Sequence, residues 1–195
     1  MNARALRPLT MASATVPDDD AALLARVAAH DGAALGALYD RHHASVRRFV
    51  ARCTRHDVED LVQETFLVAA GRAASFDGRA SARPWLLGIA AHLLQRRNRG
   101  WARFSRALER LFDRDPEPAA PPDHALARSE ASARVERALA SLTEVRRVVL
   151  VMAEVEELPC EEIARALGVP VGTVWTRLHH ARKALREALA REEGP

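Results

Sequence analysis

Two amphipathic segments with a break between them, at residues 158–178, constrain the fold of this chain more than any other feature. Pro159 suits the first position of a helix, where its missing N–H costs nothing, and Glu161 complements the positive end of the helix dipole. Gly168 can end that helix in the left-handed conformation, and Pro170 prevents its continuation just before a second helix. The segment therefore predicts a helix-turn-helix, in which the second helix lies in the major groove of DNA.

The second helix, predicted over 171–192, has one apolar and one polar side. The apolar stripe consists of Val174, Leu178, Ala181, Leu185 and Leu189. The outward side carries hydrogen-bonding and basic groups, with two arginines at its borders that can reach phosphates: Thr173, Trp175, Thr176, Arg177, His179, His180, Arg182 and Lys183. A plain helical hairpin with a solvated polar face is the alternative. Acidic residues precede the turn, whereas the charged residues from 163 to 186 are all basic, and this division favours DNA binding.

Composition favours packed helices over sheets, because 48% of the residues are apolar, only 5% are aromatic, and alanine is abundant. Residues 113–124 contain four prolines and four acidic residues, a composition typical of an extended linker. We therefore expect an all-α fold of two small helical domains joined by a flexible linker. The expected division is a disordered leader over 1–17, a helical domain over 18–112, the linker over 113–125 and the helix-turn-helix domain over 126–195. The expected helices lie at about 18–29, 33–52, 57–70, 82 to beyond 94, 126–140, 143–156, 159–167 and 171–192.

Several classes of protein are disfavoured. Cys53 and Cys160 are the only cysteines and lie far apart in sequence, so neither a disulfide framework nor a zinc site is expected. No apolar stretch is long enough to span a membrane, and the N-terminal residues lack the apolar segment of a signal peptide. No histidine and carboxylate spacing indicates a metal site. We therefore expect a cytoplasmic protein without cofactor, metal or catalytic residues, which argues against a nuclease or another enzyme.

The helix predicted over 57–70 has an acidic side. Asp57, Asp60 and Glu64 share it at helical spacing, whereas the apolar residues form another side: Val58, Leu61, Val62, Phe66 and Ala69. Acidic residues are favoured in the first turn of any helix, so a solvated face is one interpretation. A docking surface for a basic partner is the other.

The following helix begins near Pro84 and Trp85 and ends in a run of arginines that includes Arg96 and Arg97. Its apolar residues are mostly expected in the core. Basic groups close to a flexible loop and to aromatic side chains can hold single-stranded nucleic acid, because they combine base stacking with attraction for phosphates.

Taken together, these segments resemble bacterial sigma factors of the extracytoplasmic function (ECF) group, from about residue 20 to about residue 190. The stretch 57–66 (Asp-Val-Glu-Asp-Leu-Val-Gln-Glu-Thr-Phe) is similar to region two of that family. The stretch 76–81 with Trp85-Leu86 and Ile89-Ala90 is similar to the promoter-reading segment that follows. Region four is matched by Glu161-Glu162-Ile163-Ala164, by the stretch 168–174 and by Arg177-Leu178.

The resemblance implies partners and a role for each surface. Core RNA polymerase would be bound through its clamp helices by Asp57, Asp60, Leu61, Gln63, Glu64 and Phe66. The loop 75–83 and the helix from Trp85 would melt the minus-ten element of promoter DNA and capture its non-template single strand. The residues expected to contact that strand are Phe76, Asp77, Arg79, Ser81, Trp85, Arg96 and Arg97. The polar side of 171–192 would face the duplex minus-thirty-five element, the linker would thread toward the RNA exit path, and an anti-sigma factor would be an inhibitory partner.

Four residues depart from the family pattern. Trp175 and His180 stand where such proteins carry basic residues, which removes guanine or phosphate contacts and predicts an altered promoter preference. His92 replaces an asparagine, and Gly88 is expected to loosen its helix. The competing hypothesis is a stand-alone helix-turn-helix regulator with a helical sensor domain over residues 20–105. The acidic face and the two separate DNA-facing surfaces favour the sigma factor.

Overall fold

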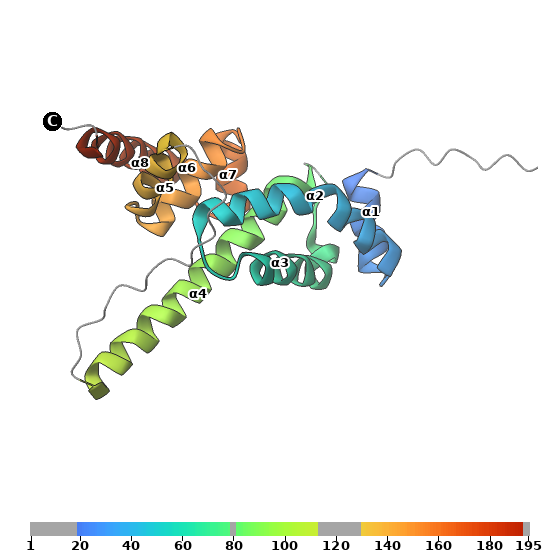
Figure 1. Cartoon of the computed structure of the whole chain (residues 1–195). Coiled ribbons are helices and arrows are strands. Elements are labelled where there is room, and N and C mark those ends of the chain that lie inside the picture. The colour runs from blue at the N-terminus through green and yellow to red at the C-terminus, as the bar shows by residue number, and fades with distance from the viewer. Residues whose placement is uncertain (1–18, 79–80, 113–129, 193–195) are drawn as a thin grey trace, which may run out of the picture.

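The structure is a computed structural model that describes residues 19–78, 81–112 and 130–192, and in these ranges every regular element is helical (Figure 1). The predicted all-α fold is confirmed. The elements are α1 (Asp20–Ala28), α2 (Gly32–Cys53), α3 (Val58–Arg72), the 3-10 helix η1 (Ala73–Ser75), α4 (Ala82–Phe112), α5 (Glu130–Ala140), α6 (Glu144–Glu154), α7 (Cys160–Leu167) and α8 (Val171–Glu192). The predicted leader over 1–17 and the predicted linker over 113–125 lie outside the described residues.

Local side-chain chemistry explains where the first helices begin. Asp19 accepts a hydrogen bond from the backbone N–H of Ala22 at 2.7 Å and so caps α1. Asp31 caps α2 by accepting from the N–H groups of Ala33 and Ala34 at 2.9 and 3.1 Å. The sequence predicted α3 to begin at Asp57, but this residue precedes the helix with a left-handed φ of 55° and caps nothing with its side chain.

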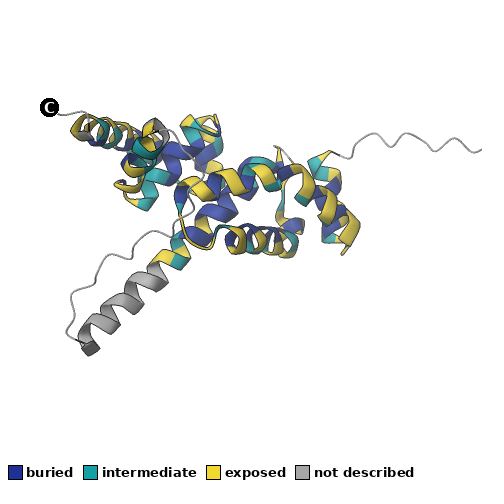
Figure 2. Cartoon of the chain, viewed as in Figure 1, coloured by how far each residue is buried: buried dark blue, intermediate teal, exposed yellow. Residues whose placement is uncertain are grey.

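The first part of α4 lies at the centre of the molecule, between α2 and α3 on one side and α7 on another, whereas its later part projects away from the other helices (Figure 1). The six residues from Leu86 to Ala91 are all buried, although two turns of a helix on a domain surface normally leave one face exposed. Figure 2 shows the buried residues as a band that runs from α1 through α4 into α6 and α7. One hydrophobic cluster therefore includes residues from both halves of the chain.

The backbones of the two halves approach each other closely at Gly88. A Cβ atom placed on this residue would lie 2.3 Å from the backbone oxygen of Ala166 in α7, so only glycine permits this approach. The prediction that Gly88 loosens its helix does not include this packing role. The helix α4 is regular through Gly88, and the missing side chain makes room for α7.

Arg147 of α6 ties the start of the second half to the first half. Its guanidinium donates hydrogen bonds to the carbonyl oxygens of Leu139, Ala140 and Leu142, at distances from 2.8 to 2.9 Å. The same group donates to the carbonyl of Cys53 at the end of α2, at 2.8 Å. Carbonyls left unpaired at the ends of α5 and α2 are thereby satisfied by one planar side chain.

Candidate nucleic-acid interface

The acidic side of α3 is only partly a free surface. Asp60 and Gln63 are exposed, and the structure gives neither of them an ion pair within the described residues. Glu64, one turn further along, accepts from Arg96 at 2.6 Å and from Arg97 at 3.4 Å. The outward carboxylate and amide that remain available for a basic partner are therefore those of Asp60 and Gln63.

Two residues predicted to contact the polymerase are buried in the structure. Leu61 is 1% exposed and Phe66 is 4% exposed, because both belong to the side of α3 that packs on the core. The sequence analysis instead missed Leu67, which is 69% exposed. It follows Gln63 by four residues and therefore extends the same outward side of α3 with an apolar group.

The structure brings together two sets of residues that the sequence assigned to different partners. Arg97 lies 3.1 Å from Asp57 as well as 3.4 Å from Glu64, so the arginines near the middle of α4 neutralise the acidic start of α3. These pairs are solvent-exposed, and Arg96 retains 74% of its side-chain exposure. Exposed ion pairs of this kind contribute about 0–1 kcal/mol each, so a polymerase or DNA surface can replace them at little cost.

The loop before α4 places an aromatic pair beside the start of that helix. The rings of Phe76 and Trp85 are tilted by 59° with centroids 5.4 Å apart, and both side chains are half-buried. Asp77 and Ser81 are exposed, whereas Arg79 lies outside the described residues. Phe76, Asp77, Ser81 and Trp85 thus lie around one short segment, whereas Arg96 and Arg97 lie further along α4, beside α3.

Asp20 of α1 holds the first residue of α4 in place. Its carboxylate accepts from the backbone N–H of Ala82 at 2.9 Å, contacts Ser81 Oγ at 3.3 Å, and lies 2.9 Å from both Arg41 and His42 Nε2. Burial alone would raise the pKa of Asp20, but the hydrogen bonds from His42, from the Ala82 amide and from Arg41 outweigh it and lower the pKa to about 2. The charge of Asp20 therefore fixes the start of the helix that follows the loop.

An open hollow of about 390 Å³ lies between α1, η1 and the loop. Its floor is apolar, and its rim carries the exposed Asp77 and the left-handed Gly78, whose φ is 68°. The lining residues are Ala21, Leu24, Ala25, Ala28, Ala73, Ala74, Phe76, Asp77 and Gly78. A shallow apolar hollow beside an aromatic pair can accept a planar base.

The helix-turn-helix has the predicted geometry at its turn. Gly168 has a φ of 64° and ends α7, and the N–H of Val169 donates to the carbonyl of Ala164 at 3.0 Å. Pro159 precedes α7 by one residue instead of occupying its first position. Val174 and Ala181 are completely buried and Leu178 is 5% exposed, so the inner side of α8 is fixed against α6 and α7.

The outer side of α8 is presented to solvent. The exposed members of the predicted set are Trp175, Thr176, His179, His180, Arg182 and Lys183, while Thr173 and Arg177 are half-buried. Trp175 is 56% exposed, an unusual position for the largest side chain. Arg182 pairs with Glu154 at 2.6 Å, and this exposed pair must open before the arginine can reach a phosphate. Within the described residues no group of His, Cys, Asp and Glu could hold a metal ion.

Comparison with known proteins decides the family. Residues 38–104 match sigma-70 region 2, and residues 132–185 match sigma-70 region 4. The ECF RNA polymerase sigma factor SigC of Mycobacterium tuberculosis is 36% identical over 89% of this chain and 94% of its own length. The chain belongs to the ECF group of the sigma-70 family. RNA polymerase sigma factor YlaC of Bacillus subtilis is 31% identical over 80% of this chain and 93% of its own length. The chain is therefore a sigma factor that acts in transcription initiation.

Solved structures agree with this assignment. CnrH, in complex with the cytosolic domain of CnrY, is 28% identical, with 89% of this chain and 99% of that chain covered and a TM-score of 0.63. The sigma factor RpoE of Bartonella quintana, in complex with the anti-sigma factor NepR, is 24% identical, with 75% of this chain and 91% of that chain covered and a TM-score of 0.59. At this identity the likeness supports only the fold. No helix in the described part of this sigma factor is both long and apolar enough to cross a membrane.

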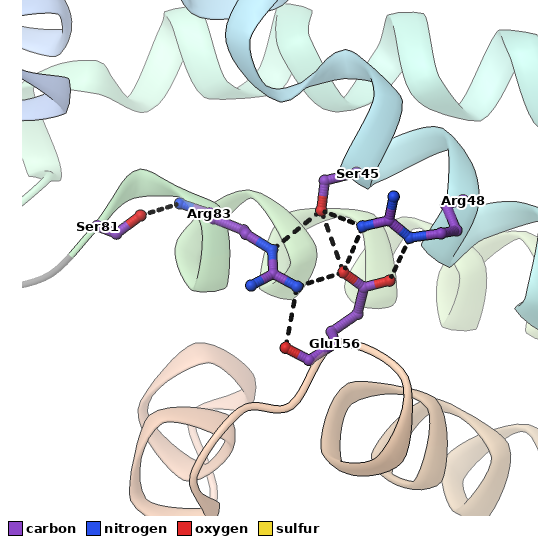
Figure 3. A network of polar contacts seen from close by, with 5 residues as sticks. All are labelled: Ser45, Arg48, Ser81, Arg83 and Glu156. Carbon is purple, nitrogen blue, oxygen red and sulfur yellow. Dashed lines mark hydrogen bonds and ion pairs between the residues drawn. The ribbon is translucent and has the colours of Figure 1, made fainter.

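One cluster in this sigma factor was missed by the sequence analysis. The side chain of Glu156, between α6 and α7, is 0% exposed and accepts hydrogen bonds from residues of the other half (Figure 3). Arg48 Nε and Nη2 donate to its two oxygens at 3.2 Å, Ser45 Oγ donates at 3.1 Å, and Arg83 Nη2 donates at 2.5 Å. No signal in the sequence pairs positions 108 residues apart, so local pattern could not have found this cluster.

Proposed function

We propose that this sigma factor docks on core RNA polymerase through the outward side of α3, chiefly Asp60, Gln63 and Leu67, with Asp57 and Glu64 at its border. The supporting observation is that these side chains are accessible in a helix whose other side is held in the core by Leu61, Phe66 and their neighbours. An apolar group beside a carboxylate suits a partner helix that carries both basic and aliphatic side chains. Leu61 and Phe66 act by fixing the orientation of α3.

The loop before α4 is proposed to capture the non-template strand of the minus-ten element. Phe76 and Trp85 offer aromatic faces, and the hollow beside them is lined by small apolar residues. A base that leaves the duplex costs a few kcal/mol, which stacking in such a site offsets. The exposed Asp77 and Ser81 extend this surface, Arg79 is proposed to contact the same strand, and Arg96 and Arg97 attract phosphates once they leave Asp57 and Glu64.

The outer side of α8 is proposed to face the minus-thirty-five element as duplex DNA, with Thr173, Thr176, Arg177, His179, Arg182 and Lys183 toward the groove and backbone. Trp175 and His180 give this helix fewer charged donors than a helix with two basic residues there. We therefore infer a promoter preference in which apolar contact with thymine methyl groups replaces part of the guanine recognition.

We also propose that residues 18–112 and 126–195 act as separate units on DNA. The two promoter elements lie about 25 base pairs apart, which is about 85 Å of duplex at about 3.4 Å per base pair. A compact chain of this length has a diameter of only about 40 Å. Residues 113–129, fully extended, can span at most about 60 Å, which is enough to separate the two halves.

Further parts of the proposal concern partners and chemistry. The complex of CnrH with the cytosolic domain of CnrY supports a protein partner of this chain, and we propose that it is an inhibitory anti-sigma factor that covers the same surfaces. The chain contributes promoter specificity to the polymerase and catalyses no reaction itself. Because its polymerase and promoter are in the cytoplasm of a bacterium, it acts there.

The decisive experiment is gel filtration of the purified protein with core RNA polymerase. We expect the wild type to co-elute with the polymerase and Asp60→Arg to lose this co-elution. Glu59→Arg is the matched control, because it makes the same charge change at the neighbouring exposed position, where the wild-type residue faces Arg47. Equal loss in both variants contradicts the proposed docking face. If the wild type fails to co-elute and binds duplex DNA alone, the stand-alone regulator is the better account.

A further inference from the structure

Glu156 occupies an unusual position for a carboxylate. It lies in the short connection between α6 and α7, yet its oxygens are held by Ser45 and Arg48 of α2 and by Arg83 of α4 (Figure 3). Arg83 also donates to the backbone carbonyl of Glu156 at 2.9 Å. The second half of the chain thus inserts one acidic residue into a basic site that belongs entirely to the first half.

The site is built for an anion. A buried carboxylate is costly unless charged donors surround it, and here two guanidinium groups and a hydroxyl do so. Burial would raise the pKa of Glu156, but the hydrogen bonds from Arg48 and Arg83 outweigh it and hold the pKa below its ordinary value. Arg83 Nε also donates to Ser45 Oγ at 3.0 Å, so the donors are oriented by one another as well as by the anion.

The position of the site relates it to the proposed single-strand surface. Arg83 is in the first turn of α4, two residues before Trp85, and its backbone N–H donates to Ser81 Oγ at 3.2 Å. Arg83 and Trp85 are both in the first turn of α4, but residues two apart project to different sides of a helix, so a strand stacked on Trp85 must cross this turn to bring a phosphate to Arg83. A strand that follows this path meets aromatic faces for its bases and paired arginines for its backbone, the two kinds of contact that single-strand binding combines.

We propose that Arg48, Arg83 and Ser45 form a binding site for a backbone phosphate of single-stranded DNA, and that Glu156 fills this site while the two halves of the chain are closed. A backbone phosphate, like the carboxylate that it replaces, offers two oxygens that share one negative charge and can accept from paired arginine donors. This inference rests on the proposed function, because the strand concerned is the non-template strand beside Phe76 and Trp85.

The proposal links DNA binding to the opening of the chain. The closed form cannot span the two promoter elements, so its halves separate on a promoter, and separation withdraws Glu156 from the site. Two arginines then remain without their anion, and a phosphate supplies the missing charge. In the free protein, the same carboxylate keeps the site filled and suppresses binding to single strands.

The experiment measures binding of the free full-length protein to a fluorescein-labelled oligo(dT) of about 20 nucleotides by fluorescence anisotropy, over a series of salt concentrations. We expect Glu156→Gln to bind about tenfold more tightly than the wild type, because it removes the internal anion and leaves the arginines. Glu157→Gln is the matched control, since it removes the same charge at the next, exposed residue and is expected to bind as the wild type does.

The arginines are tested in the Glu156→Gln background. Adding Arg48→Gln or Arg83→Gln is expected to abolish the gain and to reduce the slope of log K against log salt by about 0.7, which corresponds to one phosphate contact. Adding Arg47→Gln, at the neighbouring exposed arginine, is expected to leave the gain in place. Circular dichroism of each variant checks that its helices remain formed.

A second route to the open state guards against misfolding of Glu156→Gln. Gly88→Ala forces α4 and α7 apart without changing any donor of the site, and we expect it also to tighten oligo(dT) binding in a manner that requires Arg48 and Arg83. The proposal is overturned if neither Glu156→Gln nor Gly88→Ala tightens oligo(dT) binding. It is also overturned if the tighter binding persists when Arg48 and Arg83 are both replaced. The anisotropy assay contains no polymerase. A negative result in it therefore overturns the phosphate site without affecting the proposed docking on polymerase, and loss of polymerase co-elution does not affect the oligo(dT) result.

Discussion

Replacing Gly88 by alanine tests whether the two halves of the chain pack as closely as the structure shows. The added Cβ would lie 2.3 Å from the oxygen of Ala166, whereas ordinary contact begins at 3.4 Å, so α7 must retreat by about 1 Å. Overpacking of this kind costs about 1–3 kcal/mol. Alanine is a better helix former than glycine by about 1 kcal/mol, and this gain opposes the cost.

The control separates these two effects. Gly36 lies on the exposed side of α2, and a Cβ placed there meets no atom within 4 Å. Gly36→Ala therefore gains helix propensity without a clash, and we expect it to raise the free energy of unfolding by about 0.5–1 kcal/mol. The free energy of unfolding of Gly88→Ala is expected to be about 1–3 kcal/mol lower than that of Gly36→Ala, because both variants gain helix propensity and only Gly88→Ala introduces a clash.

Urea unfolding followed by tryptophan fluorescence measures the difference. With an m value of about 2 kcal/mol/M, the midpoints of the two variants are expected to differ by about 0.5–1.5 M. Small-angle scattering is expected to show a larger radius of gyration for Gly88→Ala alone. Equal stabilisation by both substitutions, with unchanged dimensions, would refute the close contact between α4 and α7 and with it the closed arrangement of the halves.

Three further predictions concern single residues. The low pKa of Asp20 means that its carboxylate stabilises the fold by about 2 kcal/mol above pH 4, and that this contribution is lost as the pH falls toward 2. The difference in free energy of unfolding between the wild type and Asp20→Asn, measured in urea, should therefore narrow over that pH range. A difference that stays constant would contradict the low pKa. Arg147→Lys is expected to lower the free energy of unfolding by about 2–4 kcal/mol, because an ammonium cannot donate to carbonyls at the ends of both α5 and α2. A urea midpoint equal to that of the wild type would show that these hydrogen bonds contribute little. Trp175→Ala is expected to change stability by less than about 0.5 kcal/mol but to weaken binding of the polymerase complex to minus-thirty-five duplex about tenfold, with the similarly exposed Val135→Ala as the control that leaves DNA binding unchanged.

Several parts of the fold could be predicted because their causes are local. Gly168 and Pro170 lie at the turn of the helix-turn-helix, and helical periodicity correctly identified Val174, Leu178 and Ala181 as the buried side of α8. The predicted start of α3, at about Asp57, agrees within one residue with its observed start at Val58. Asp57 adopts a left-handed φ and pairs with Arg97 of another helix, which local pattern does not contain.

Burial within a helix was harder to predict when a second element covers the same side. Leu61 and Phe66 belong to the apolar stripe of α3, yet the resemblance to region two gave them contacts with the polymerase; the structure places both in the core. The exposed Leu67 lies on the opposite side, where an apolar residue has no intramolecular reason to be. Its accessibility became evident only when the neighbouring helices were in place.

By itself the sequence determined the helical class, the helix-turn-helix with its outward polar side, and the acidic and basic surfaces, because these depend on the spacing of side chains along single helices. Only the tertiary structure decided how the two halves meet. Gly88 admits the backbone of α7, and Glu156 enters a site made by Arg48 and Arg83. Such contacts depend on distances between residues far apart in the chain, and a buried charge becomes favourable only where folding has already assembled its partners.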